Sequence, residues 1–184
     1  MDKEKSEFFE AAIITAKAAI RFAERHADLA FEQSKGEADP LRKAELQKIA
    51  EICRRCPAEP ARTFYEAMES FWLTHVLIHL NSCEWSISPG RFDQYMYPFY
   101  QKDMANGQLT KEQAEELMTC LWIKFNEVRV GIDIITYQNL MVGGVDENGN
   151  DATNDLSYLC LETQKKIKEA QPSLSMRWHQ GTPI

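Results

Sequence analysis

The N-terminal segment carries apolar side chains on one face of a predicted helix. Between Ser6 and about Gln33, apolar positions recur every three or four residues, and most of them are alanine. These positions are Phe9, Ala12, Ile13, Ala16, Ala19, Ile20, Ala23, Ala27 and Ala30. The pattern predicts a long helix with one buried face, whose small side chains allow another helix to pack closely against it.

A second helix is predicted after the break SKGEADP. Asp39 followed by Pro40 is a typical cap and first-turn pair, and the helix extends through Cys53. Pro57 and Pro60 end this helix, because a proline ring cannot continue it.

The third predicted helix is apolar on almost every side. Thr63 and Glu66 form a capping box before the segment FYEAMESFWLTHVLIHL. A helix without a polar face is expected to be buried all round. Because a chain of 184 residues has little material with which to cover such a helix, the pattern indicates that further protein surrounds this chain.

Two more helices follow the turn sequence SPG. The first is rich in aromatic residues, spans about Arg91 to Met104 and ends at the turn NGQ. The second begins at a capping box formed by Thr110 and Gln113 and extends to about Val128.

Strand and helix signals alternate in the C-terminal part of the chain. Thr136 to Val142 is rich in β-branched and aromatic residues and is predicted as a strand, and Leu156 to Ile167 returns to helical spacing. From Ser173 to Trp178, apolar and polar residues alternate with the period of a second strand. The fold class is therefore α/β and mainly helical, with a βαβ unit. Two parallel strands alone would leave their edges unpaired and their faces uncovered, which again indicates missing protein.

The composition is that of one domain or part of a larger one, with 44% hydrophobic residues. The formal charge of -7 comes from interspersed acidic and basic residues, which argues against nucleic acid or an anionic membrane as a partner. The five scattered cysteines favour reduced thiols. No leader sequence or apolar run long enough to span a bilayer occurs, so we expect a soluble, cytoplasmic protein.

Spacing alone suggests little catalytic chemistry. Cys53 and Cys56 form the sequence CRRC, but no second ligand pair follows at the spacing of a zinc site, so two thiols near a helix end are the favoured interpretation. His75 and His79 lie on one side of a predicted helix without an intervening acid or a third ligand. Buried histidines that form hydrogen bonds within the core are favoured there over a metal site.

The stretch from Asn81 to Tyr100, NSCEWSISPGRFDQYMYPFY, has two interpretations that the residues alone leave open. In the first it is a helix-capping loop, with Ser88 as the cap, Pro89 at the first helical position and Arg91 paired with a nearby acid. In the second, the polar residues that follow the buried helix point into a cavity. On physical grounds the first is favoured.

Several blocks of the sequence resemble the pyruvate formate-lyase-like glycyl radical enzymes. They are CRRCPAEPARTFYEAMESFW, SISPGRFDQYMYPFYQKD, LTKEQAEELMTCLWIKFNE, QNLMVGGVDENGNDATNDLSYLCLET and PSLSMRWHQGTP, in the family's order. They are most similar to the branch of glycerol and hydroxyproline dehydratases and of related C–N, C–S and decarboxylating lyases. The resemblance implies that residues 1–184 are a partial domain of a ten-stranded α/β barrel, supplying outer helices and the first barrel strands.

The resemblance also implies how the parent enzyme works. A separate iron–sulfur, S-adenosylmethionine-dependent activase installs a radical on a glycine near the C-terminus, and this radical oxidises a cysteine that abstracts hydrogen from a small-molecule substrate. The parent enzyme is expected to be a homodimer. Neither the family's cysteine loop nor its radical glycine segment occurs in this sequence, so no residue here is assigned as catalytic, no cofactor or metal is expected to bind, and the chain alone is expected to be inactive.

Two substrate-binding residues follow from the resemblance. In dehydratase-like members the two residues before ISPGR reach the substrate pocket, and here these are Trp85 and Ser86. Ser86 fits the usual serine and would form a hydrogen bond with a substrate hydroxyl or carboxylate. Trp85 stands where a polar residue is common, which favours a smaller, more apolar or cationic substrate portion.

The expected function is thus a fragment of a glycyl radical lyase or dehydratase that cleaves a C–O, C–N, C–S or C–C bond. A formate C-acetyltransferase is the alternative within the family. Outside it, the alternatives are a non-enzymatic helical remnant, a binding module, or one half of a split barrel that pairs with a complementary chain.

Overall fold

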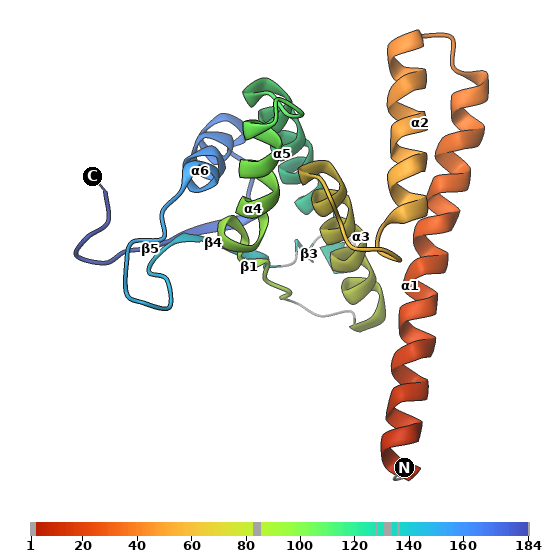
Figure 1. Cartoon of the computed structure of the whole chain (residues 1–184), viewed down its shortest axis with the longest axis horizontal. Helices are drawn as coiled ribbons and strands as arrows, with labels where there is room; N and C mark the ends of the chain where they lie inside the picture. The colour runs from red at the N-terminus through yellow and green to blue at the C-terminus, as the bar shows by residue number, and fades with distance from the viewer. Residues whose placement is uncertain (1–2, 83–85, 128, 131–133, 136, 184) are drawn as a thin grey trace. The chain divides into compact units, whose positions relative to one another are not determined.

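The computed structural model describes residues 3–82, 86–127, 129–130, 134–135 and 137–183. The chain forms two compact units, one of residues 1–61 with 69–77 and the other of residues 62–68 with 78–184 (Figure 1). Both units are mainly helical, as the apolar periodicity predicts.

The first unit is built on a helical hairpin. Helix α1 spans Lys3–Gly36 and helix α2 spans Pro40–Arg55, where the Asp39 carboxylate accepts a hydrogen bond from the Leu41 backbone N–H as the predicted cap. The buried residues form two clusters, Ala23, Ala27, Cys53 and Leu73 in one and Ala30, Leu46 and Ala50 in the other. Small side chains on α1 thus allow the predicted close helix packing.

The prediction of one buried face along all of α1 is wrong for the N-terminal half of the helix. Phe9 and Ile13 are 53% and 52% exposed. The reason is length, because α1 continues past the end of the shorter α2, as Figure 1 shows.

Helix α3 spans Phe64–Ser82 and begins with an altered capping box. The Thr63 hydroxyl accepts a hydrogen bond from the Glu66 N–H at 3.1 Å, as predicted. The Glu66 carboxylate instead accepts from the N–H of Arg62 at 2.7 Å, one residue before the expected donor. The prediction that α3 is buried all round is wrong near its end, because Ile78 and Leu80 are 45% and 63% exposed.

Three further helices form the core of the second unit: α4 at Phe92–Ala105, α5 at Lys111–Phe125 and α6 at Asp155–Ile167. The predicted capping box of Thr110 and Gln113 is present in full at the start of α5. Large apolar side chains of these helices are fully buried, among them Phe92, Met118, Trp122, Phe125 and Leu156.

A three-stranded parallel sheet packs against these helices. Its strands are β1 at Gly90–Arg91, β4 at Asn139–Gly143 and β5 at Ser173–Arg177, in the order β1-β4-β5. The segment from β4 through α6 to β5 is the predicted βαβ unit. Gly90 was predicted in a turn and Arg91 at the start of a helix, but together they form β1, which pairs with β4, so one edge of β4 is not left open.

A second, smaller sheet is antiparallel and consists of β2 at Arg129–Val130 and β3 at Ile134–Ile135. The sequence pattern predicted neither strand. The predicted start of the following strand, Thr136, lies outside the described residues.

Candidate substrate-facing surface

The two residues expected to contact substrate belong to the stretch between α3 and α4. Trp85 lies outside the described residues. Ser86 is exposed, and its backbone forms a parallel bridge with Tyr137. Two residues on, the Ser88 hydroxyl accepts a hydrogen bond from the Asn139 N–H at 3.2 Å. The segment that leads into β1 therefore runs beside the chain that leads into β4.

This geometry corrects the interpretation of the stretch as a capping loop. Helix α4 begins at Phe92, and its cap residue, Arg91, makes no capping side-chain bond, so Ser88 is not the cap. Arg91 was expected to pair with an acid, but its guanidinium donates to the carbonyls of Gly143 and Val145, at 3.1 and 3.0 Å. The arginine thereby fixes the end of β4 next to β1.

One face of the parallel sheet carries polar side chains beside Met141 of β4. Leu140 and Val142 are fully buried in the core, so their neighbours in β4 point to the opposite face. On that face the Asn139 amide donates to the Ser175 hydroxyl at 2.6 Å and to the Ser173 carbonyl at 3.2 Å. Register places Asn139 beside Ser173, and residues in register point to the same side of a sheet.

We call this surface the polar sheet face and define it as Ser86, Tyr137, Asn139, Ser173 and Ser175. Its side chains are exposed or half-buried, and Tyr137 is 66% exposed. Hydroxyl and amide groups donate and accept hydrogen bonds without titrating near neutral pH. The surface suits the binding of a small polar molecule, whereas proton or electron transfer would need other groups.

Sequence reasoning found only Ser86 of these five residues. The alternation of Ser173 and Ser175 with apolar residues was recognised as a strand pattern, and the same alternation indicates which side chains share the face opposite the core. Tyr137 and Asn139 join them only through the pairing of β4 with its neighbours.

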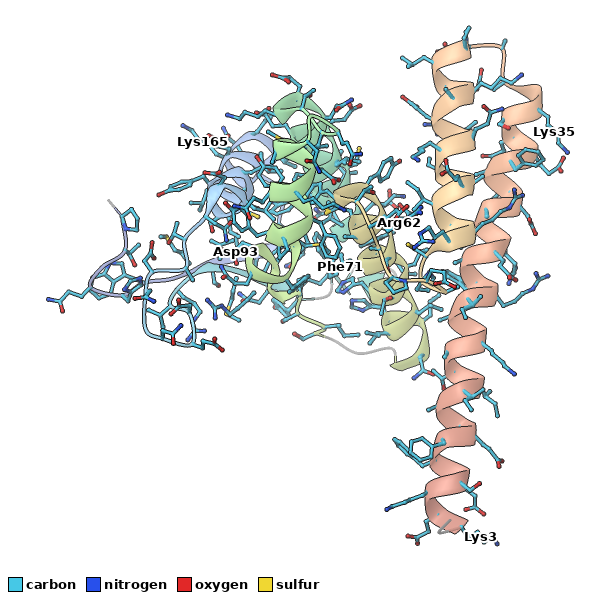
Figure 2. All side chains as sticks on the ribbon, in the orientation of Figure 1. Lys3, Lys35, Arg62, Phe71, Asp93 and Lys165 are labelled. Atoms are coloured by element: carbon cyan, nitrogen blue, oxygen red, sulfur yellow. The ribbon has the colours of Figure 1, made fainter. Side chains whose placement is uncertain are left out.

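Beneath the sheet, a buried carboxylate connects three elements. Asp93 of α4 is fully buried, and its Oδ2 accepts hydrogen bonds from the Gly143 N–H at 2.7 Å and from the Ser157 hydroxyl at 2.5 Å. Figure 2 shows Asp93 among the packed side chains of this unit. This arrangement positions the end of β4 and the start of α6, and so supports the polar sheet face from the core side.

The cysteines with described positions carry reduced thiols, and two of them are held in the protonated form. Burial, and next the charge and hydrogen bond of Glu69, raises the pKa of Cys53 to about 12. Burial, followed by the charge of Asp93, raises the pKa of Cys160 well above its usual value. Neither thiol is suited to thiolate chemistry at neutral pH.

The other candidate groups, the CRRC cysteines and the two histidines of α3, are packed in the interior. Cys53 and Cys56 of the CRRC sequence are both buried at the end of α2, as the favoured interpretation predicts. His75 and His79 are also buried, and the His75 ring stacks on Phe71. In the part of the chain that the structure describes, no three His, Cys, Asp or Glu side chains are grouped so that they could hold a metal ion. None of the helices in that part is long and apolar enough to cross a membrane.

The whole chain is similar to lyases and dehydratases. It is 40% identical to the isethionate sulfite-lyase of Nitratidesulfovibrio vulgaris, over 98% of this chain and 23% of that protein. It is 33% identical to the trans-4-hydroxy-L-proline dehydratase of Clostridioides difficile, over 95% of this chain and 23% of that enzyme. The chain thus spans about a quarter of the length of these relatives.

Solved structures agree with this comparison. The glycerol-bound B12-independent glycerol dehydratase of Clostridium butyricum matches with a TM-score of 0.92 and 41% identity, covering 100% of this chain and 24% of that one. A glycyl radical enzyme of Archaeoglobus fulgidus matches with a TM-score of 0.93 and 41% identity, over 98% of this chain and 24% of that one. These matches confirm the predicted fold class, a mainly helical α/β part of a glycyl radical enzyme barrel.

Residues 1–184 match the sequence model of one family along their whole length, and its description is pyruvate formate lyase-like. The resemblance to glycyl radical enzymes, based on five sequence blocks, is confirmed by this match and by the relatives above. The chain belongs to the pyruvate formate lyase-like family.

Proposed function

We propose that this chain forms part of a glycyl radical lyase or dehydratase that cleaves a C–O, C–N, C–S or C–C bond of a small polar substrate. The observation that supports this most is the match, along the whole chain, to a glycerol dehydratase with glycerol bound. The (2S)-3-sulfopropanediol dehydratase of Klebsiella oxytoca, 37% identical over 98% of this chain, supports the same reaction class.

In this proposal the polar sheet face is one wall of the substrate pocket. Ser86 binds a hydroxyl or carboxylate group of the substrate, and it is suited to this role because its side chain is exposed. Asn139 and Ser175 hold each other in place across β4 and β5, so they offer the substrate a fixed pattern of hydrogen-bonding groups. Trp85 supplies an apolar or cation-binding boundary next to Ser86.

In this proposal the chain binds and orients the substrate, and other residues of the parent enzyme carry out the radical chemistry. We assign no described cysteine to hydrogen abstraction, because Cys53 and Cys160 are buried in the core and Cys120 lies on the surface of α5. The parent protein would receive its glycyl radical from an iron–sulfur, S-adenosylmethionine-dependent activase. We place it in a reducing, cytoplasmic compartment, since its five cysteines are an odd number scattered along the sequence.

A chimeric enzyme tests the proposal. This chain would replace the matching 24% of the Clostridium butyricum glycerol dehydratase, and the chimera would be activated anaerobically. We expect a glycyl radical signal in electron paramagnetic resonance, together with turnover of at least one diol, hydroxy-sulfonate or hydroxyproline substrate. The 184-residue chain treated in the same way is the matched control and should give no signal.

Two outcomes would contradict the proposal. A folded chimera that carries the radical but turns over no substrate of the panel would mean that this chain does not build a lyase pocket. A radical on the isolated chain would mean that its own residues carry the chemistry. A chimera that is unfolded by circular dichroism would be replaced by one based on the Archaeoglobus fulgidus enzyme, which matches equally well.

A further inference from the structure

Two buried glutamines stand at the starts of the strands that carry the polar sheet face. Gln138 directly precedes β4 and is 0% exposed, and Gln171 lies two residues before β5 and is 5% exposed. Burying a side-chain amide costs free energy unless its oxygen and nitrogen find hydrogen-bonding partners. The partners of these two amides therefore show what holds the strands in place.

The side-chain oxygen of Gln171 joins the two strands. Gln171 Oε1 accepts hydrogen bonds from the backbone N–H of Gln138 at 2.9 Å and from the backbone N–H of Ser173 at 3.2 Å. Because a backbone N–H can only donate, these two bonds also identify which end of the amide is the oxygen. The same oxygen accepts from the Ser173 hydroxyl at 3.4 Å. One buried atom thus binds the residue before β4 and the first residue of β5.

Gln171 is itself fixed by the end of α5. Its backbone N–H donates to Asn126 Oδ1 at 3.1 Å, and its carbonyl accepts from Asn126 Nδ2 at 2.7 Å. Asn126 is the C-terminal cap of α5, and its Nδ2 also donates to the Trp122 carbonyl at 2.9 Å. Gln138 reaches the same helix end, because its Nε2 donates to the Phe125 carbonyl at 2.8 Å. Both glutamines are thus anchored to one helix end.

These bonds orient the hydroxyl of Ser173. Its proton is directed to Gln171 Oε1, so the Ser173 oxygen keeps its lone pairs for another donor. The Ser173 carbonyl accepts from the Asn139 amide at 3.2 Å, and that amide also donates to the Ser175 hydroxyl at 2.6 Å. A displacement of Ser173 would therefore move Asn139 and Ser175 as well.

We propose that Gln171 is a positioning residue for substrate binding and acts through Ser173. This inference rests on the proposed function, in which the polar sheet face is one wall of the substrate pocket. Gln171 does not contact the substrate. It holds the Ser173 oxygen as a hydrogen-bond acceptor, so the substrate class is one that places a donor, such as a hydroxyl group, against Ser173. Loss of this contact should appear in KM, because the radical chemistry takes place on other residues.

Kinetics of the activated chimera test this proposal. Gln171→Met keeps the length of the side chain and removes the acceptor, so KM should rise about tenfold while kcat changes by less than about twofold. Gln171→Glu retains an acceptor oxygen at the same reach and should recover most of the affinity. Electron paramagnetic resonance should show the same radical signal in both variants as in the unsubstituted chimera.

Gln164→Met is the matched control. Gln164 Oε1 accepts from Trp122 Nε1 at 2.7 Å, where α5 and α6 pack together, so this variant also loses the oxygen of a hydrogen-bonded amide. In the part of the chain that the structure describes, the Gln164 side chain forms no hydrogen bond with β4 or β5. The melting temperature should fall in both variants, whereas KM should rise only in Gln171→Met. Equal increases of KM would overturn the proposal, because the effect would then be one of stability alone.

A double-mutant cycle with Ser173→Ala tests whether Gln171 acts through Ser173. In the Ser173→Ala chimera, Gln171→Met should raise KM by less than about twofold, because the hydroxyl that it positions is already absent. Full additivity of the two changes would overturn the proposal. If Gln171→Met is unfolded by circular dichroism, Gln171→Asn takes its place, since it withdraws the same oxygen by one methylene group.

Hydrogen exchange in the 184-residue chain distinguishes a failure of this proposal from a failure of the proposed function. In Gln171→Met the Gln138 N–H should exchange about tenfold faster or more than in wild type, because it loses its acceptor. The Ser173 N–H should change less, since it also donates to the Gln138 carbonyl at 3.0 Å. Unchanged exchange at Gln138 would overturn the positioning role, whatever the chimera does.

Two further outcomes concern the link to substrate. Faster exchange at Gln138 with an unchanged KM, in a chimera that turns over substrate, would overturn the link and leave the proposed function intact. An unsubstituted chimera that carries the radical without turnover would overturn the proposed function, and Gln171 would then be a structural residue.

Discussion

The Ser157 hydroxyl donates a hydrogen bond of 2.5 Å to the carboxylate of Asp93, although 64 residues separate the two in sequence. The same carboxylate oxygen accepts from the Gly143 N–H at 2.7 Å. Asp93 is fully buried and accepts hydrogen bonds from both donors. One side chain therefore links α4, β4 and α6 directly.

Replacing Asp93 by alanine should lower the free energy of unfolding by about 2–6 kcal/mol. The substitution leaves the Gly143 N–H and the Ser157 hydroxyl buried without this acceptor, and each such loss costs about 1–3 kcal/mol. Urea unfolding followed by circular dichroism measures the change. Asp155→Ala is the control, because that carboxylate is exposed and close in the fold. Equal losses for the two variants would show that the buried hydrogen bonds contribute little.

Alkaline pH should destabilise the first unit through Cys53. Burial and Glu69 raise the pKa of its thiol from 9.0 to about 12 in the folded state. A group whose pKa is raised by folding stabilises the fold fully below its unfolded pKa and loses this contribution as pH rises. The contribution should therefore decline from pH 9 upwards and be lost by pH 12.

The comparison of wild type with Cys53→Ala isolates this effect from other groups that titrate at high pH. Urea midpoints measured at several pH values from just below 9.0 towards about 12, the range between the two pKa values of Cys53, should fall more steeply with pH for wild type than for the variant. Parallel curves would show that Cys53 ionises equally well in the folded chain, contrary to its buried position.

Local signals predicted the helices well because their determinants lie within a few residues. The capping box of Thr110 and Gln113 forms as expected, since both partners belong to the same turn. The box at Thr63 forms only in part, because the carboxylate of Glu66 reaches Arg62 instead. The chain before the helix thus decides which donor a capping acid meets, and this is not visible in the motif.

The sheet depends on pairing between distant segments, and there the sequence predicted less. Gly90 and Arg91 have no strand pattern of their own and become β1 only because they pair with β4. Ser88 has the sequence context of a cap, yet it accepts from Asn139, which lies 51 residues away. Asn139 was likewise not predicted as part of the polar sheet face, because only strand pairing places it there. Ser86 was predicted from the family resemblance.

The sequence pattern also predicted wrongly that the apolar face of α1 is covered along its whole length. The spacing of apolar residues in α1 predicts correctly which side chains lie on one side of the helix, but it carries no information on the length of the packing partner. Helix α2 ends at Arg55, so Phe9 and Ile13 remain exposed. Periodicity therefore predicts a face, and only the three-dimensional structure shows whether that face has a partner.

Trp85→His in the activated chimera should change substrate preference. The indole is bulky and cannot donate or accept a proton as imidazole does, so histidine should favour larger polar substrates. We expect the ratio of kcat/KM values for a polar and a less polar substrate to shift about tenfold or more, the size of effect that one pocket contact supplies. Phe71→Leu, a change in α3 outside the polar sheet face, is the control. Unchanged kcat/KM ratios across the panel would contradict a role for Trp85 in the pocket.

Alanine variants of Ser86 and Ser88 should distinguish a loss of substrate binding from a loss of stability. The Ser86 side chain is exposed, so Ser86→Ala should raise KM in the chimera by about tenfold, the usual value of one hydrogen bond to substrate, and leave the melting temperature unchanged. The Ser88 hydroxyl accepts from the Asn139 N–H, so Ser88→Ala should lower the melting temperature by a few degrees, for about 1 kcal/mol of lost stability. Steady-state kinetics and thermal unfolding of both variants provide the comparison. If Ser86→Ala lowers the melting temperature while KM stays constant, Ser86 is a structural residue and the polar sheet face does not extend to the substrate.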